Sequence, residues 1–127
     1  KGIGRILPHL NGRFAAQAMR VPTVNVSAID LTVTLNKDVS VESVNAAIRA
    51  GALKSLPLVL ACTDEPLASC DFNHDPRSAI VDLSQTRVSG TRLVKVLAWF
   101  DNEWAFANRM LDVAELIRKL ELKGNSK

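Results

Sequence analysis

The stretch of residues 93–122 constrains the fold more than any other part of the sequence. Residues 93–100 (LVKVLAWF) are mostly apolar and β-favouring, which is typical of a buried strand. Asp101 and Asn102 follow, and their short side chains can accept hydrogen bonds from free N–H groups at a helix start. Apolar residues then recur every three or four positions, which predicts an amphipathic helix that ends at Gly124. This apolar stripe comprises Phe106, Met110, Val113, Ile117 and Leu120.

The rest of the chain contains shorter patterns of both helical and strand type. Residues 29–35 alternate between apolar and polar side chains, which predicts a half-buried strand of an antiparallel sheet. Ser40 is a suitable cap for a helix that ends near Gly51. Weaker patterns predict a helix over 3–10, strands over 13–21, 56–63 and 67–72, and a turn over 73–76. We therefore expect an α/β domain of the α+β type, with a mixed, mostly antiparallel sheet, helices on one face and a long C-terminal helix.

The composition excludes several classes of protein. The 127 residues suit one domain, and the apolar fraction of 47% and charged fraction of 23% are ordinary for a soluble globular protein. The 16 basic and 13 acidic residues are scattered and give a net charge of +3, so no nucleic-acid partner is expected. No apolar run approaches the roughly 20 residues of a membrane span, so no membrane partner is expected either.

Cysteine and histidine give no catalytic or metal pattern. Cys62 and Cys70 have the spacing of neither a disulfide framework nor a zinc site, which favours a reducing cytoplasmic location. Neither has a neighbouring histidine, and Cys62 lies among apolar residues, so we expect packing and not nucleophilic chemistry. His74 and Asp75 are either an acid/base pair or a pair of loop residues. We favour the loop pair, because neighbours on a turn rarely converge on one substrate atom.

Several segments, in order, resemble one known family. The segment W-F-D-N-E-W-A-F-A-N-R-M at 99–110 resembles the strand-to-helix junction near the C-terminus of the glyceraldehyde-3-phosphate dehydrogenase family. R-V-P-T at 20–23, followed by N-V-S-A-I-D-L-T-V at 25–33, is a second signature. The motifs at 72–82, 85–90 and 99–110 resemble the erythrose-4-phosphate dehydrogenase branch more closely. The resemblance covers essentially the whole chain.

The resemblance assigns roles to two residues. Arg20 matches the arginine that holds the phosphate of the sugar substrate, and its planar guanidinium suits phosphate oxygens. The alternative is a structural ion pair with a carboxylate such as Asp30. Asn102 matches the asparagine that hydrogen-bonds the nicotinamide carboxamide of NAD, and the alternative is a simple helix cap. Ala105 departs from the family, which generally has glycine there and so allows a closer backbone approach.

The resemblance also implies how the parent enzyme works. An upstream cysteine attacks a phosphosugar aldehyde, hydride passes to NAD, and a thioester remains. Water then releases 4-phosphoerythronate for pyridoxal phosphate synthesis in the erythrose branch, whereas inorganic phosphate acts in the glycolytic branch. Residues 1–127 would form the C-terminal part of the catalytic domain of a homotetramer. The NAD-binding domain and the catalytic cysteine and histidine would lie upstream, so no catalytic residue is expected here. A glycolytic enzyme and an inactive oligomerisation module remain the alternatives.

Overall fold

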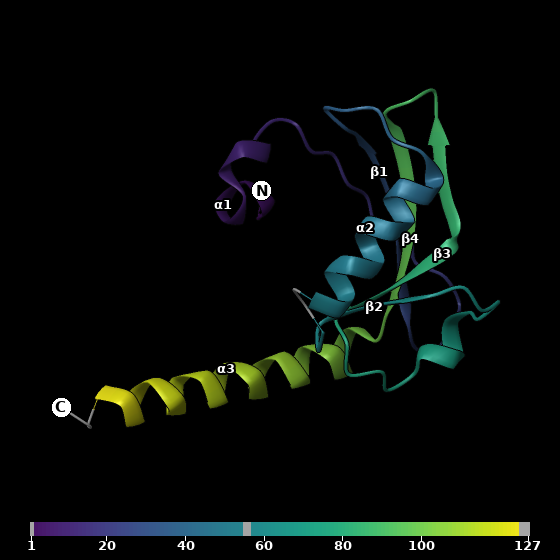
Figure 1. Cartoon of the computed structure of the whole chain (residues 1–127). Helices are drawn as coiled ribbons and strands as arrows, with labels where there is room; N and C mark the ends of the chain where they lie inside the picture. Colours follow the sequence, from purple (N-terminus) through teal and green to yellow (C-terminus); the bar gives the residue numbers. More distant parts are fainter. Residues whose placement is uncertain (1, 55–56, 125–127) are drawn as a thin grey trace.

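The described residues form a four-stranded mixed sheet with helices attached to it. The computed structural model describes residues 2–54 and 57–124, and Figure 1 shows the arrangement. The sheet has the order β1-β4-β3-β2, in which β4 pairs antiparallel with β1 and β3, and β2 runs parallel to β3. The predicted fold class is confirmed. The elements are α1 (Ile3–Ile6), the 3₁₀ helix η1 (Pro8–Leu10), β1 (Ser27–Thr34), α2 (Val41–Lys54), β2 (Leu60–Thr63), the 3₁₀ helix η2 (Ser69–Phe72), β3 (Ala79–Ser89), β4 (Leu93–Phe100) and α3 (Asn102–Gly124).

The hairpin of β3 and β4 forms the centre of the sheet. The two strands are joined by a three-residue loop in which Gly90 has a φ of +59°, a backbone conformation that glycine adopts without strain. Strand β4 coincides with the predicted strand over 93–100. Strand β3 was not predicted. Its register shifts between Asp82 and Arg87, so neither a buried run nor a clean alternation continues along its full length.

Helix α2 covers one face of the sheet over β2 and β3 (Figure 1). The predicted cap is confirmed, because the backbone N–H of Ser43 donates to Ser40 Oγ at 3.2 Å. The helix continues three residues past Gly51, to Lys54. A buried cluster of Ala61, Phe72 and Ile80 forms part of the core, and the ring of Phe72 stacks on Trp99 with 5.7 Å between centroids. The other side chains packed against this cluster are Val26 and Leu67.

Strand β1 is correctly predicted in position but not in burial. It spans Ser27–Thr34, yet the side chains of Ile29 and Leu31 are 49% and 38% exposed. The strand pairs only with β4, and the described residues place no second layer over it. The alternating pattern therefore marks a face suited to burial, which is left open in this chain.

Two N-terminal predictions are wrong. The helix predicted over 3–10 is split into α1 and η1, because Pro8 lacks the backbone N–H that would continue the first helix. The strand predicted over 13–21 is an irregular exposed segment, since no other described segment pairs with it. A ladder of hydrogen bonds defines a strand, and a segment without a partner cannot form one.

Two predicted strands in the middle of the chain also need correction. The strand predicted over 56–63 is shortened to β2, and residue 56 lies outside the described residues. The strand predicted over 67–72 ends instead in the 3₁₀ helix η2, whose start is turned by a hydrogen bond from the Ala68 N–H to Asp71 Oδ2 at 2.8 Å. The predicted turn over 73–76 is observed at residues 73–74.

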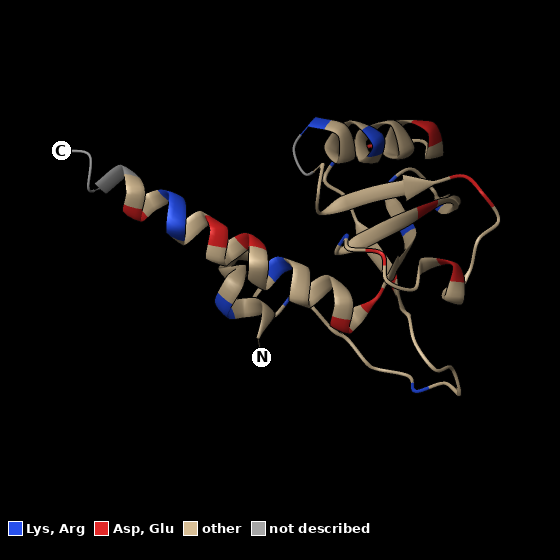
Figure 2. Ribbon diagram, turned by 90° about the horizontal axis from the view of Figure 1, so that it is seen from below, with Lys and Arg blue, Asp and Glu red and all other residues tan. Residues whose placement is uncertain are grey.

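Helix α3 begins at Asn102 and ends at Gly124, as predicted, and it extends away from the sheet (Figure 1). Figure 2 shows charges of both signs interspersed along it. Ion pairs join Arg109 to Asp112 and both Arg118 and Lys119 to Glu115. The predicted tail at 125–127 lies outside the described residues. In the part of the chain that is described, no helix has the length and apolarity that crossing a membrane requires.

Candidate functional site

A buried carboxylate lies where β4 passes into α3. Asp101 is only 1% exposed and accepts hydrogen bonds from three segments of the chain. Its Oδ1 accepts from the backbone N–H of Trp104 at 3.0 Å, which caps the first turn of α3. Its Oδ2 accepts from the backbone N–H of His74 and from Asn25 Nδ2, both at 2.9 Å. The junction is therefore held by one side chain.

Opposing effects set the protonation of Asp101. Burial alone raises the pKa of a carboxyl group, because it disfavours the charged form. The hydrogen bonds from Trp104, His74 and Asn25 act in the other direction, and the pKa of Asp101 is lowered overall. Asp101 is consequently an anion at neutral pH, and all of its hydrogen bonds are charge-assisted.

The loops around Asp101 contain unusual backbone conformations. Val26, Ser69 and His74 have positive φ angles of 70°, 36° and 61°, although none of them is glycine. The hydroxyl of Ser69 donates to the carbonyl of Asn25 at 3.4 Å, and the Asn25 side chain also donates to Asn73 Oδ1. Such conformations persist where surrounding contacts fix them, and they concentrate at functional sites. All three residues are adjacent to, or bonded to, a group that contacts Asp101.

An aromatic pair lies at the start of α3. The rings of His74 and Trp104 are tilted by 40°, with 4.9 Å between centroids, and Trp104 is 45% exposed. Ala105, which stands where the resemblance to the dehydrogenase family leads us to expect glycine, is buried with an exposure of 5%. The helix start thus accommodates the additional methyl group.

Asn102 is the first residue of α3, and its side chain is exposed. The cap interpretation of Asn102 is wrong, because Asp101 supplies the cap. Among the described residues, the Asn102 amide has no hydrogen-bond partner in the structure. Both its carbonyl oxygen and its amino group are therefore available to a ligand.

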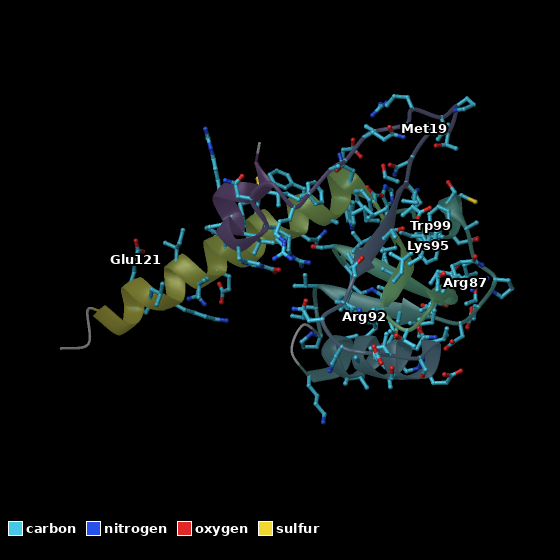
Figure 3. The ribbon with its side chains drawn as sticks, turned by 90° about the horizontal axis from the view of Figure 1, so that it is seen from above. Met19, Arg87, Arg92, Lys95, Trp99 and Glu121 are labelled. Atoms are coloured by element: carbon cyan, nitrogen blue, oxygen red, sulfur yellow. The ribbon has the colours of Figure 1, made fainter. Side chains whose placement is uncertain are left out.

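Arg20 lies in the irregular exposed segment that precedes β1. Figure 3 places its neighbour Met19 on the outer bend of this segment, away from Lys95 on β4. The alternative ion pair with Asp30 is not formed, because Asp30 Oδ2 pairs with Lys95 Nζ at 2.9 Å. No ion pair of Arg20 occurs within residues 2–54 and 57–124, and no contact there joins it to Asn102. The roles of Arg20 and Asn102 stay predictions.

The remaining polar candidates have structural partners or none. Asp75 pairs with Arg77, whose hydrogen bonds lower the pKa of the Asp75 carboxyl, so it forms no acid/base pair with His74. Cys62 is half-buried in β2 and Cys70 is exposed, and both thiols are free. His9 is exposed. Within the described ranges, no group of three His, Cys, Asp or Glu side chains is placed to hold a metal ion.

Sequence reasoning identified Asp101 as a helix-start residue but missed its wider contacts. Its donors at His74 and Asn25 are 27 and 76 residues away, and no spacing rule connects positions so distant. Trp104 and Asn25 lie inside quoted motifs, and this was the only signal that could have singled them out.

A comparison with known families identifies the domain. The family described as "Glyceraldehyde 3-phosphate dehydrogenase, C-terminal domain" matches residues 1–102. The chain belongs to this family. The match covers the segment with Arg20 and ends at Asn102, so both predicted site residues lie inside it. The chain is thus a domain of an oxidoreductase family whose enzymes typically use NAD.

Proposed function

We propose that this chain is the C-terminal part of the catalytic domain of an NAD-dependent dehydrogenase that oxidises D-erythrose 4-phosphate to 4-phosphoerythronate. The product would feed pyridoxal phosphate synthesis in the cytoplasm. The NAD-binding domain and the catalytic cysteine and histidine belong to other parts of the same enzyme. The observation that carries the proposal is at the start of α3, where Asp101 caps the helix and the Asn102 amide has no hydrogen-bond partner among the described residues.

Asn102 suits a nicotinamide carboxamide. An amide side chain both donates and accepts, so it can pair with another amide through complementary hydrogen bonds. NAD, when bound, supplies the hydride acceptor. Asn102 would fix the rotation of the carboxamide and thereby orient the ring toward the substrate. Its place on the first turn of a capped helix restricts its own movement.

Arg20 suits the phosphate end of the substrate. Its guanidinium has no carboxylate partner among the described residues, whereas Arg49, Arg77 and Arg109 are each paired with an aspartate. An arginine without an internal partner retains its donors for a phosphate group. Arg20 would anchor the sugar phosphate while the aldehyde end reacts elsewhere.

The choice of aldehyde rests on sequence motifs. Residues 72–82, 85–90 and 99–110 resemble the erythrose branch, and the structure brings parts of the first and last together in the pairing of His74 with Trp104. The description of the matching family favours a second candidate, which is the glycolytic oxidation of glyceraldehyde 3-phosphate. The two candidates differ in substrate and in the group that releases the acyl intermediate.

The exposed outer strand supports an assembly role within the same enzyme. Ile29 and Leu31 on β1 leave an apolar strip open to solvent, where a second subunit could cover it. This agrees with a homotetramer joined across its catalytic-domain sheets. An oligomerisation module without activity would use the same strip but would not need the free Asn102 amide.

The deciding experiment measures NADH formation by the complete enzyme. The values of kcat/KM for erythrose 4-phosphate and glyceraldehyde 3-phosphate are compared with and without inorganic phosphate. We expect a preference for the four-carbon sugar without a phosphate requirement. A preference for the triose with obligatory phosphate would instead establish the glycolytic activity. No NADH from either sugar would contradict both.

Two variants of the complete enzyme test the residue roles. Arg20→Ala should raise KM for the phosphosugar, and Asn102→Ala should raise KM for NAD. Arg92→Ala and Asn36→Ala are matched controls, because both residues are exposed. Arg92 lies in the β3–β4 loop, and Asn36 lies in the connection between β1 and α2. The 127-residue chain alone should form no NADH, and any activity of that chain would show that it contains its own nucleophile.

A further inference from the structure

We propose that Asp101 is a positioning residue that ties the segment carrying Arg20 to the helix carrying Asn102. The phosphate anchor and the nicotinamide contact would then be held at a fixed separation by one carboxylate. This inference rests on the proposed function for its kinetic consequence. The physical tie itself is present in the structure of this chain.

On the α3 side, Asp101 is connected to the helix by the hydrogen bonds that cap it. Oδ1 of Asp101 holds the N–H of Trp104, and the carbonyl of Asp101 accepts the N–H of Ala105 at 3.0 Å. The ring of His74 packs on Trp104, while the His74 backbone N–H is held by Oδ2. The first turn of α3, where Asn102 lies, is therefore fixed by both the cap and the loop beside it.

The tie on the side of Arg20 runs through Asn25, five residues further along the chain. Nδ2 of Asn25 donates to Asp101 Oδ2 at 2.9 Å. The next residue, Val26, has a φ of +70° and packs against the core cluster of Ala61, Phe72 and Ile80. A β-branched residue rarely adopts this conformation, so its surroundings must hold it. The segment carrying Arg20 is thus fixed at one end, although no described strand pairs with it.

The carboxylate chemistry of Asp101 is essential to this arrangement. Three N–H donors converge on two oxygens, and an ionised carboxyl group can accept all of them. An amide at the same position has one acceptor oxygen and an amino group that would face a donor. Asp101→Asn therefore preserves the shape of the side chain and breaks at least one of the ties.

A matched control exists in the same sheet. Asp82 is also a buried carboxylate, with an exposure of 5%, but within the described ranges both hydrogen bonds to its side chain come from Ser84, two residues away. Asp82→Asn disturbs a buried hydrogen-bonded aspartate without separating distant segments. A general loss of stability would be shared by both variants, whereas loss of the tie would be specific to Asp101.

The kinetic test uses the complete enzyme and measures KM for NAD and for erythrose 4-phosphate separately. Asp101→Asn should raise both constants by about five- to tenfold, roughly the effect of one lost hydrogen bond. Asn25→Ala leaves the cap in place, so it should raise KM for the phosphosugar and not KM for NAD. Asp82→Asn should change neither. Equal changes in all three variants would overturn the proposal.

A reciprocal exchange provides a rescue. In the double variant Asn25→Asp with Asp101→Asn, the amide at 101 can donate to the carboxylate at 25 and still cap the helix through its oxygen. We expect KM for the phosphosugar to recover relative to Asp101→Asn alone. A double variant no better than the single one would contradict a direct tie between these two side chains.

Hydrogen exchange tests the tie without reference to activity. Peptides spanning residues 20–27 of the complete enzyme should exchange faster in Asp101→Asn and Asn25→Ala than in Asp82→Asn. Unchanged exchange there would overturn the tie, whatever the substrate. If exchange changes while Arg20→Ala and Asn102→Ala leave both KM values unaltered, the tie is supported and the proposed function fails.

Discussion

Helices α2 and α3 are both amphipathic and both capped by a side chain, yet they are used differently. Helix α2 lies against the sheet, where Ala52 is buried and Asn45 Nδ2 donates to the carbonyl of Leu83 at 3.1 Å. Helix α3 contacts the rest of the molecule mainly at its start, through buried Ala105 and through Arg109, which donates to Leu58 O and Ser78 Oγ at 3.2 Å. All five residues of its apolar stripe are exposed, with values between 65% for Phe106 and 52% for Ile117.

The difference shows what an apolar stripe does and does not predict. The stripe predicts that a helix has a face to bury, but it does not identify what will cover that face. On α2 the sheet of the same domain covers it. On α3 the described residues leave the apolar face exposed. Burial of that face would therefore require a partner surface. Four measurements can test this contrast.

The largest difference in the free energy of unfolding should come from the same Ala→Asp substitution made once in each helix. Ala52→Asp places a charge against the sheet and should lower the free energy of unfolding by about 3 kcal/mol or more. Ala114→Asp, on the exposed surface of α3, should cost less than about 1 kcal/mol, close to the difference in helix propensity. Urea unfolding followed by tryptophan fluorescence measures both. Similar losses would show that α3 is as firmly packed as α2.

The next largest difference in stability should come from removing the caps of the two helices, Asp101 on α3 and Ser40 on α2. Asp101→Asn leaves buried donors unpaired and should cost about 1–3 kcal/mol. Ser40→Ala removes an exposed cap and should cost about 1 kcal/mol, because water can replace the lost partner. The same unfolding assay decides. A larger loss for Ser40→Ala would contradict the central role given to Asp101.

The pH dependence of stability should also differ between the carboxylates at the starts of the two helices, Asp101 before α3 and Glu42 on α2. The folded pKa of Asp101 is lowered from 3.8, so its stabilising effect is complete above pH about 4 and is lost as pH falls through the folded value. The stability difference between the wild type and Asp101→Asn should therefore shrink below pH 4. Glu42 on α2 also has a lowered pKa but is fully exposed, and Glu42→Gln should alter the pH profile less. A difference that stays constant down to pH 2 would contradict the assignment.

The smallest effect should be weak self-association of the isolated chain through α3. Light scattering should show an average mass that rises with concentration, because an exposed apolar stripe favours contact with another copy. Ile117→Lys should reduce this rise, whereas Ala46→Lys adds the same charge to the exposed side of α2 and should not. A monodisperse monomer at all concentrations would show that the stripe does not associate.

Sequence patterns predicted the elements whose local and tertiary preferences agree. Strand β4, helix α3 and the cap of α2 follow directly from periodicity and capping residues. The 13–21 segment was predicted as a strand, but strand formation depends on a partner, and no described segment pairs with it. The strand prediction for residues 67–72 failed for a different reason, because the Asp71 carboxylate turns the backbone locally.

The candidate site was predicted in part. Arg20 and Asn102 were selected by resemblance to a family, and the structure removes the competing structural explanation for each. Asp101 was recognised only as a helix-start residue. Its links to Asn25 and His74 depend on the pairing of β1 with β4, which brings distant positions together only in the folded chain.

The pairing of β1 with β4 also affects how the chain folds during synthesis. Strand β1 is completed at Thr34, and its partner is completed 66 residues later, at Phe100. At roughly 5–20 residues per second, β1 would wait for about 3–13 s before its ladder could close. During that interval the backbone N–H and C=O groups of β1 lack the ladder with β4, and the Asn25 side chain lacks Asp101. Slow translation between these strands should therefore lower the yield of folded protein more than the same delay after residue 100.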